Sequence, residues 1–100
     1  MTTMPMIPKQ PRQEDPEYLD FVRGKLCLCK GIQCIGEIAP HHTISRGAWG
    51  SDYRVIPICA FHHLEMENHG LNFMENTYNF SALDEIIKLL SEYLREPKND

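Results

Sequence analysis

Apolar residues recur at helical spacing near both ends of the chain, and two short β-rich stretches lie between them. Asp15 followed by Pro16 predicts the N-cap and first residue of a helix, which Gly24 can end. Ser81 with Asp84 three residues later predicts the cap of a final helix. The apolar residues of this final helix, which we expect to cover the core, are Leu83, Ile86, Ile87, Leu90 and Leu94.

The middle of the chain is predicted to hold a cysteine-containing loop, two strands and a helix. Residues 26–36, LCLCKGIQCIG, contain three cysteines and two glycines and show no regular periodicity. The elements expected after this loop are a strand at 37–41, a glycine-containing loop at 43–52, a strand at 53–58 and a helix at 60–68 followed by Gly70. This order of elements predicts the α+β fold class.

The length of 100 residues is that of one domain with one modest core. Residues 1–14 lack apolar periodicity, so we expect a disordered arm, then a domain at 15–96 and a tail at 97–100. The sequence shows neither an apolar run near the roughly 20 residues of a membrane span nor the pattern of a signal peptide. We therefore expect a cytoplasmic protein without membrane contact, whose cysteines are thiols or metal ligands rather than disulfides.

The spacing of cysteine and histidine predicts a structural zinc site. Cys59 and His62 form a C-x2-H pair where the second strand meets its helix, and Cys27 and Cys34 could supply the other ligands. Cys29 could replace either loop cysteine. Each cysteine could instead be a small buried hydrophobe, but three cysteines within eight residues of a polar loop favour the metal.

A second metal site is predicted around His63, whose direction on a helix differs from that of His62 by about 100°. Glu67 lies four residues on and shares the face of His63, and His69 is the alternative ligand if the helix ends early. His41 could add a ligand from the first strand. Few protein ligands leave positions for phosphate and water, and we expect Mg²⁺ or Mn²⁺ there.

His42 is left over from both sites and is the candidate general base, because a neutral imidazole can activate water near pH 7. Asp52 or a backbone carbonyl could fix its tautomer. Arg46 or Arg54 could hold the phosphate. The net charge of −4 counts against nucleic-acid binding, although several basic residues lie in the first half of the chain, near the proposed sites.

The segment from Ile38 to Gly70, which contains HHTISRGAWGSDYRVIPICAFHHLEMENHG, resembles the HNH (His-Me finger) nucleases of the small phage and prophage branch. Members of this branch have paired histidines, a Gly-rich loop, an Asp, a strand ending Pro-aliphatic-Cys, a second histidine pair, and then an acidic or His residue and Gly. The preceding DPEYLDFVRGKLC is similar to the helix before their first cysteine.

The resemblance implies a ββα-metal finger with a zinc knuckle and flanking helices. It implies that His42 is the general base, that Asp52 orients it, and that His41 and His63 lie at the catalytic metal. Cys59 and the histidine three residues later would match half of the zinc knuckle.

The chain departs from the family in three ways: the loop lacks the usual C-x2-C, Glu67 stands where His is frequent, and the Gly-rich loop lacks a usual Lys. We expect a DNA endonuclease of phage type in a bacterial host cell, with structural zinc, a catalytic divalent metal and, by family analogy, a recombinase or phage protein as a further partner. One alternative is a non-catalytic zinc-finger adaptor that binds DNA or protein. Another is an interaction domain that uses the final helix as its partner surface.

Overall fold

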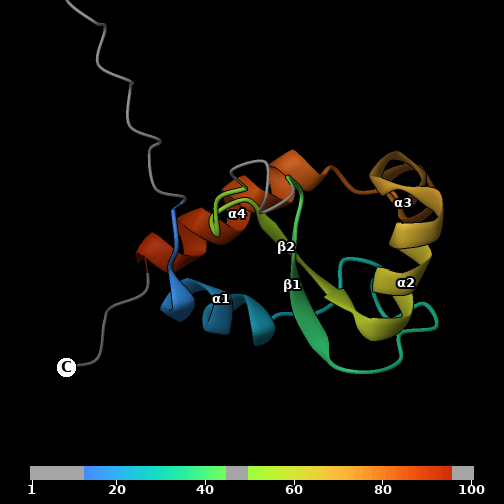
Figure 1. Cartoon of the computed structure of the whole chain (residues 1–100), viewed down its shortest axis with the longest axis horizontal. Helices are drawn as coiled ribbons and strands as arrows, with labels where there is room; N and C mark the ends of the chain where they lie inside the picture. The colour runs from blue at the N-terminus through green and yellow to red at the C-terminus, as the bar shows by residue number, and fades with distance from the viewer. Residues whose placement is uncertain (1–12, 45–49, 96–100) are drawn as a thin grey trace, which may run out of the picture.

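Four helices and two strands make up the part of the chain that the structure describes, which is residues 13–44 and 50–95 of a computed structural model (Figure 1). In chain order the elements are α1 (Pro16–Arg23), β1 (Ile38–His42), β2 (Val55–Cys59), α2 (Ala60–His69), α3 (Leu71–Tyr78) and α4 (Ala82–Arg95). The α+β class is confirmed. None of the described helices is long and apolar enough to cross a membrane.

Helix α1 begins and ends where its capping residues predict. The Asp15 carboxylate accepts a hydrogen bond from the Tyr18 N–H at 3.1 Å, and the following proline occupies the first turn. Gly24 is the C-cap, and its N–H donates to helix carbonyls. The helix buries Tyr18 and Val22 completely and thereby anchors the N-terminal side of the domain.

Strands β1 and β2 form an antiparallel pair in which His41 lies opposite Ile56 and His42 opposite Val55. The prediction for the first strand was one residue too early, and that for the second began two residues too early, because Tyr53 and its neighbour lie in a turn. All five residues of β2 are buried, although the sequence suggested loose alternation. The reason is that helices pack on β2 from both ends of the hairpin, with α1 and α4 at one end and α2 at the other (Figure 1). Met74 of α3 belongs to the same core cluster as Ile56 and Ile58 of β2.

Helix α3 was not predicted from the sequence. Gly70 ends α2 with a φ of +87°, and the chain continues directly into a new helix that Asn79 ends in the left-handed conformation. Leu71, Met74 and Tyr78 have helical spacing and face the core, so the signal was present but short. The Glu75 carboxylate then accepts the Ala82 N–H at 2.7 Å, which joins α3 to the start of α4.

The predicted core face of α4 was wrong in part. Ala82, Ile86 and Leu89 are the buried residues, whereas three of the predicted core residues, Leu83, Ile87 and Leu94, are 58%, 54% and 81% exposed. The apolar arc of α4 is wider than the surface of β2 and α1 that the helix covers, so only one half of the arc is buried. The periodicity alone could not show which half that would be.

The core has two adjoining clusters that share β2 and α4. One joins the cysteine loop, α2 and α3 to β2, and the other packs Tyr18 and Val22 of α1 against Val55 and Leu89. Outside α1, the Gln13 carbonyl accepts the Asp52 N–H at 2.9 Å, so this residue of the predicted arm contacts the domain. The rest of the arm at 1–12 and the predicted tail lie outside the described residues.

Candidate metal centre and histidine site

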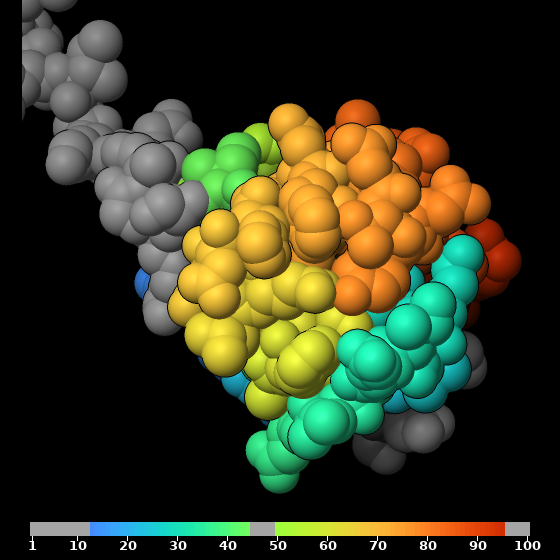
Figure 2. Space-filling model, turned by 90° about the vertical axis from the view of Figure 1, so that its right-hand side faces the viewer, coloured from blue at the N-terminus to red at the C-terminus, as the bar shows by residue number. Residues whose placement is uncertain are grey.

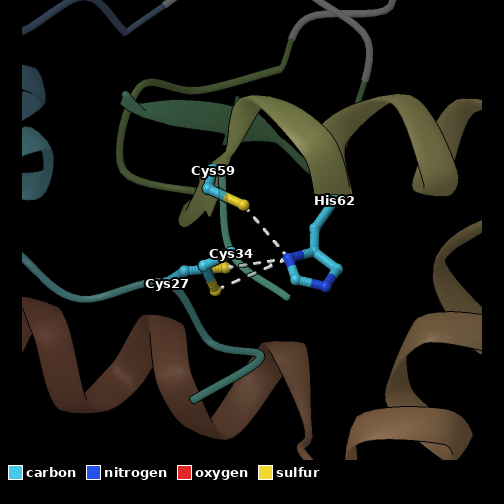
Figure 3. Close-up of side chains that lie close together, drawn as sticks. All are labelled: Cys27, Cys34, Cys59 and His62. Carbon is cyan, nitrogen blue, oxygen red and sulfur yellow. Dashed lines mark hydrogen bonds between the residues drawn. The ribbon is translucent and has the colours of Figure 1, made fainter. Parts of the chain in front are cut away.

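Four metal-ligating side chains from three parts of the chain meet in one buried place (Figure 3). Cys27 and Cys34 come from the loop before β1, Cys59 ends β2, and His62 lies in the first turn of α2. Their ligand atoms all lie within 4.8 Å of one another. The Nδ1 atom of His62 is 3.0 Å from the Cys59 Sγ, 3.6 Å from the Cys34 Sγ and 3.7 Å from the Cys27 Sγ.

This geometry fits a tetrahedral zinc ion. Zinc bonds to sulfur at about 2.3 Å and to nitrogen at about 2.0–2.1 Å, which places sulfur and nitrogen roughly 3.6 Å apart across a tetrahedral angle. The loop cysteines already have that spacing, and Cys59 needs a shift of about half an ångström. The opposite ring atom of His62, Nε2, is buried without a hydrogen-bond partner among the described residues, against the rings of Phe61 and Tyr78. A metal at Nδ1 would compensate for burying this ring.

The loop reaches this position through left-handed residues. Lys30, Gly31 and Gln33 have φ between 54° and 82°, so the chain turns sharply between the two loop ligands, and Gly36 after them has a φ of 91°. At Gly36 a Cβ atom would lie 2.6 Å from the Ala60 Cβ, so only glycine allows the loop to approach α2 this closely. Figure 2 shows the loop, α2 and α3 side by side on one face of the molecule.

The structure decides between the two candidate loop cysteines. Cys34 belongs to the cluster and Cys29 does not. Cys29 is fully buried in the core, and its backbone N–H donates to the Cys27 Sγ at 3.5 Å. Such an N–H donor would stabilise a thiolate ligand, so Cys29 supports the cluster through its backbone rather than its sulfur.

The thiols of the cluster differ in acidity. Burial raises the pKa of Cys59, but hydrogen bonds from the backbone of His62 and Ile35 and from the His62 ring outweigh it and bring this pKa down to about 7. Burial, together with the neighbouring Cys27, raises the pKa of Cys34 to about 11. Because thiolates are the ligands, metal binding must expel the Cys34 proton, and affinity for the metal should increase with pH.

A second arrangement joins the end of β1 to the turn before β2. The Nε2 atom of His42 lies 2.8 Å from the Asp52 Oδ1, and both side chains are largely buried, 14% and 4% exposed. In the neutral imidazole this contact keeps the proton on Nε2 and leaves Nδ1 to accept a proton. Of the two tautomer-fixing partners considered from the sequence, the carboxylate is the one present.

The sequence did not reveal the residues that hold Asp52. Its second oxygen accepts the Asp15 N–H at 2.8 Å, and the Asp15 carboxylate accepts the Tyr53 hydroxyl at 2.6 Å. Asp15 thus caps α1 and fixes the His42 partner at the same time. The capping signal at Asp15 was readable from the sequence, but its contact with a residue 37 positions away was not.

His41 and His63 lie together where β1 meets α2. Their ring centroids are 4.7 Å apart, and the His63 Nε2 is 3.5 Å from the Glu67 Oε1 one helical turn on. The pKa of His41 is lowered, first by burial and then by His63 and His42, so this ring is neutral and able to bind a metal at pH 7. Helix α2 continues through His69. His69 is six residues after His63, so its side chain leaves the helix in a different direction from that of His63, and it packs on Phe73 instead.

The structure favours Glu67 over His69 as the neighbour of His63. These histidines and Glu67 are gathered less tightly than the cysteine cluster, which is the one compact group of three or more ligands in the described chain. Of the two candidate phosphate ligands, Arg54 is exposed and follows Asp52 by two residues, and Arg46 lies outside the described residues.

These observations define a small α+β protein with a Cys₃His cluster that can bind a metal such as zinc. The chain belongs to the family described as protein of unknown function DUF968, which matches residues 2–95. It is 30% identical over 93 residues to the uncharacterized protein YdfU of Escherichia coli (strain K12). The matched segment covers 88% of this chain and 25% of YdfU, so the chain spans about a quarter of the length of that relative. No solved structure matches this chain.

Proposed function

We propose that this protein is a metal-dependent DNA endonuclease of the HNH (His-Me finger) type. The observation that carries the proposal is the His42–Asp52 pair, a largely buried imidazole whose Nε2 is bonded to a carboxylate. This arrangement gives a general base of fixed tautomer, which can take a proton from the attacking water.

The neighbouring His41, His63 and Glu67 are the residues that would hold the catalytic divalent metal. Such an ion would stabilise the charge on the leaving oxygen. Two imidazoles and one carboxylate suit Mn²⁺ better than Mg²⁺, which prefers oxygen ligands. The order β1, β2, α2 agrees with the proposed ββα-metal finger. The His41 and His63 rings lie 4.7 Å apart, and His42 is the next residue of β1 after His41.

In this proposal the Cys₃His cluster holds a structural zinc. Its four ligands tie the loop, β2 and α2 together, and α2 carries His63 and Glu67. The zinc would thus fix the orientation of the helix that presents two of the catalytic metal ligands. A role for phage or recombinase partners, and the bacterial cytoplasm as location, follow from the resemblance to the phage branch of the family.

We expect the purified protein to nick supercoiled plasmid DNA in the presence of Mn²⁺, more slowly with Mg²⁺, and not with excess EDTA. The order of the two metals follows from the ligand types. Gel electrophoresis of the relaxed and linear forms over time measures the rates. Absence of cleavage of both single- and double-stranded DNA with either metal would contradict the proposal.

A non-catalytic zinc adaptor is the second candidate, because the Cys₃His cluster is the compact ligand group among the described residues and an adaptor would need no other. Both candidates predict one zinc per chain, so zinc content does not distinguish them. An adaptor would bind DNA or protein without metal-stimulated cleavage, and in it the His42–Asp52 pair would only join β1 to the turn before β2.

We expect Glu67→Ala to raise the Mn²⁺ concentration needed for half-maximal nicking by about 10-fold or more, because this change removes the only carboxylate of the proposed site. His69→Ala is the matched control, since His69 lies at the end of the same helix but away from His63. Titrations of nicking rate against Mn²⁺ measure both. Equal metal requirements for Glu67→Ala and the parent protein would exclude Glu67 as a ligand.

A further inference from the structure

Helix α4 carries an apolar stripe beside its buried face, and the stripe touches the core through Leu90. Leu83, Ile87 and Leu94 are 58%, 54% and 81% exposed, and Leu90 between them is half-buried. These four residues are separated by four, three and four positions, which is the spacing of a coiled-coil seam. Ala82, Ile86 and Leu89 bind α4 to the core, so the three exposed residues of the stripe are not needed to attach the helix.

Charged residues beside the stripe are arranged with opposite signs at the two ends of the helix. Asp84 lies in the first turn of α4 and Arg95 in the last. On a helix of 100° per residue, both lie on the same flank of the stripe, roughly 60–80° from Ile87. A second helix that packs antiparallel on the stripe would face this flank with the same flank of its partner and bring Asp84 near Arg95 of the other helix. A parallel helix would instead face this flank with the opposite one, and Asp84 and Arg95 would remain unpaired across the interface.

We infer that this stripe is the interface of a twofold-symmetric dimer in which two α4 helices pack antiparallel. Leu83 of one copy would lie against Leu94 of the other, and Ile87 against Leu90 of the other. Each contact would occur twice, as the symmetry of an isologous dimer requires. In this arrangement the partly positive N-terminus of each α4 would also lie beside the partly negative C-terminus of the other.

This dimer should be weak. A helix of 14 residues is about 21 Å long, and its stripe offers less than the roughly 800 Å² that each partner buries in a standard interface. We therefore expect a dissociation constant on the order of 10 µM or higher, within reach of sedimentation at high protein concentration.

Sedimentation equilibrium of the full chain between about 1 and 500 µM should show concentration-dependent dimerisation. Ile87→Lys should raise the dissociation constant by at least about 10-fold. Leu64→Lys is the matched control, because Leu64 is an apolar residue of α2 with a similar exposed fraction of 59%, and it should leave dimerisation unchanged. Circular dichroism and zinc content should show that both variants are folded.

A charge exchange tests the antiparallel arrangement. Asp84→Arg alone and Arg95→Asp alone should each weaken self-association, because each brings like charges together. A mixture of the two variants should form heterodimers more tightly than either variant alone, because both charge pairs are then attractive. A parent protein that stays monomeric at 500 µM would overturn the inference, as would a dimer that Ile87→Lys leaves intact. Absence of heterodimers in the mixture would overturn the antiparallel arrangement.

Discussion

Replacing Cys34 with serine is expected to remove zinc from the protein and to unfold much of the domain. The cluster joins a loop to β2 and α2, and the loop itself leaves Ile32 and Ile35 more than half exposed. Structural zinc sites supply on the order of 10 kcal/mol of apparent binding energy, which is comparable with the whole stability of a domain of this size, about 5–15 kcal/mol. Metal analysis and thermal melts by circular dichroism measure the two effects.

Cys29→Ala provides the control for this experiment. Cys29 is fully buried, but only its backbone N–H contacts the cluster. This variant should therefore retain one zinc per chain and lose only about 1 kcal/mol of stability through the small cavity it creates. Loss of zinc from Cys29→Ala, with retention in Cys34→Ser, would show that the other loop cysteine is the ligand.

Replacing His42 with alanine is expected to lower the cleavage rate by roughly 10²- to 10⁴-fold, which is the usual contribution of a general base. His42 is the last residue of β1 and is not one of the four ligands of the cluster, so the variant should keep its zinc. It should be somewhat less stable than the parent protein, because buried Asp52 loses its bond to the imidazole, and a thermal melt measures this change. Nicking rates at saturating Mn²⁺, compared with those of the parent protein, measure the loss. Unchanged cleavage by a folded His42→Ala protein would exclude His42 as the base.

Asp52→Asn keeps the size of the side chain next to His42 but removes its charge, and its amide can also stabilise the other tautomer of the imidazole. We expect this variant to cleave at least about 10-fold more slowly at the same metal requirement. A loss that higher Mn²⁺ concentrations restore would instead place Asp52 at the metal. His69→Ala again serves as the control that should cleave normally.

Local chemistry in the sequence was sufficient for several features of the fold. The first and last helices were readable because their caps act over three or four residues, as the Asp15 and Ser81 side chains show by accepting N–H groups three residues on. Cys59 and His62 were readable as a pair because one helical turn brings them together, with 3.0 Å between Sγ and Nδ1. The Glu67 neighbour of His63 follows from the same periodicity.

Features that depend on distant parts of the chain needed the tertiary structure. Cys29 and Cys34 are equivalent in the sequence, and the choice between them depends on a loop path through left-handed residues. Asp52 was one of two candidate partners for His42, and the support that it receives from Asp15 spans 37 positions.

The sequence by itself determined the caps, the metal-ligating residue types and the spacing of the histidine pairs, because these act between near neighbours. Only the tertiary structure decided which cysteine completes the cluster and which half of the apolar arc of α4 meets the core. Periodicity fixes the directions in which side chains leave a helix, but the elements that pack against it decide which of those directions are buried. Leu83 and Ile86 illustrate the difference, since both fit the apolar pattern and only Ile86 is buried.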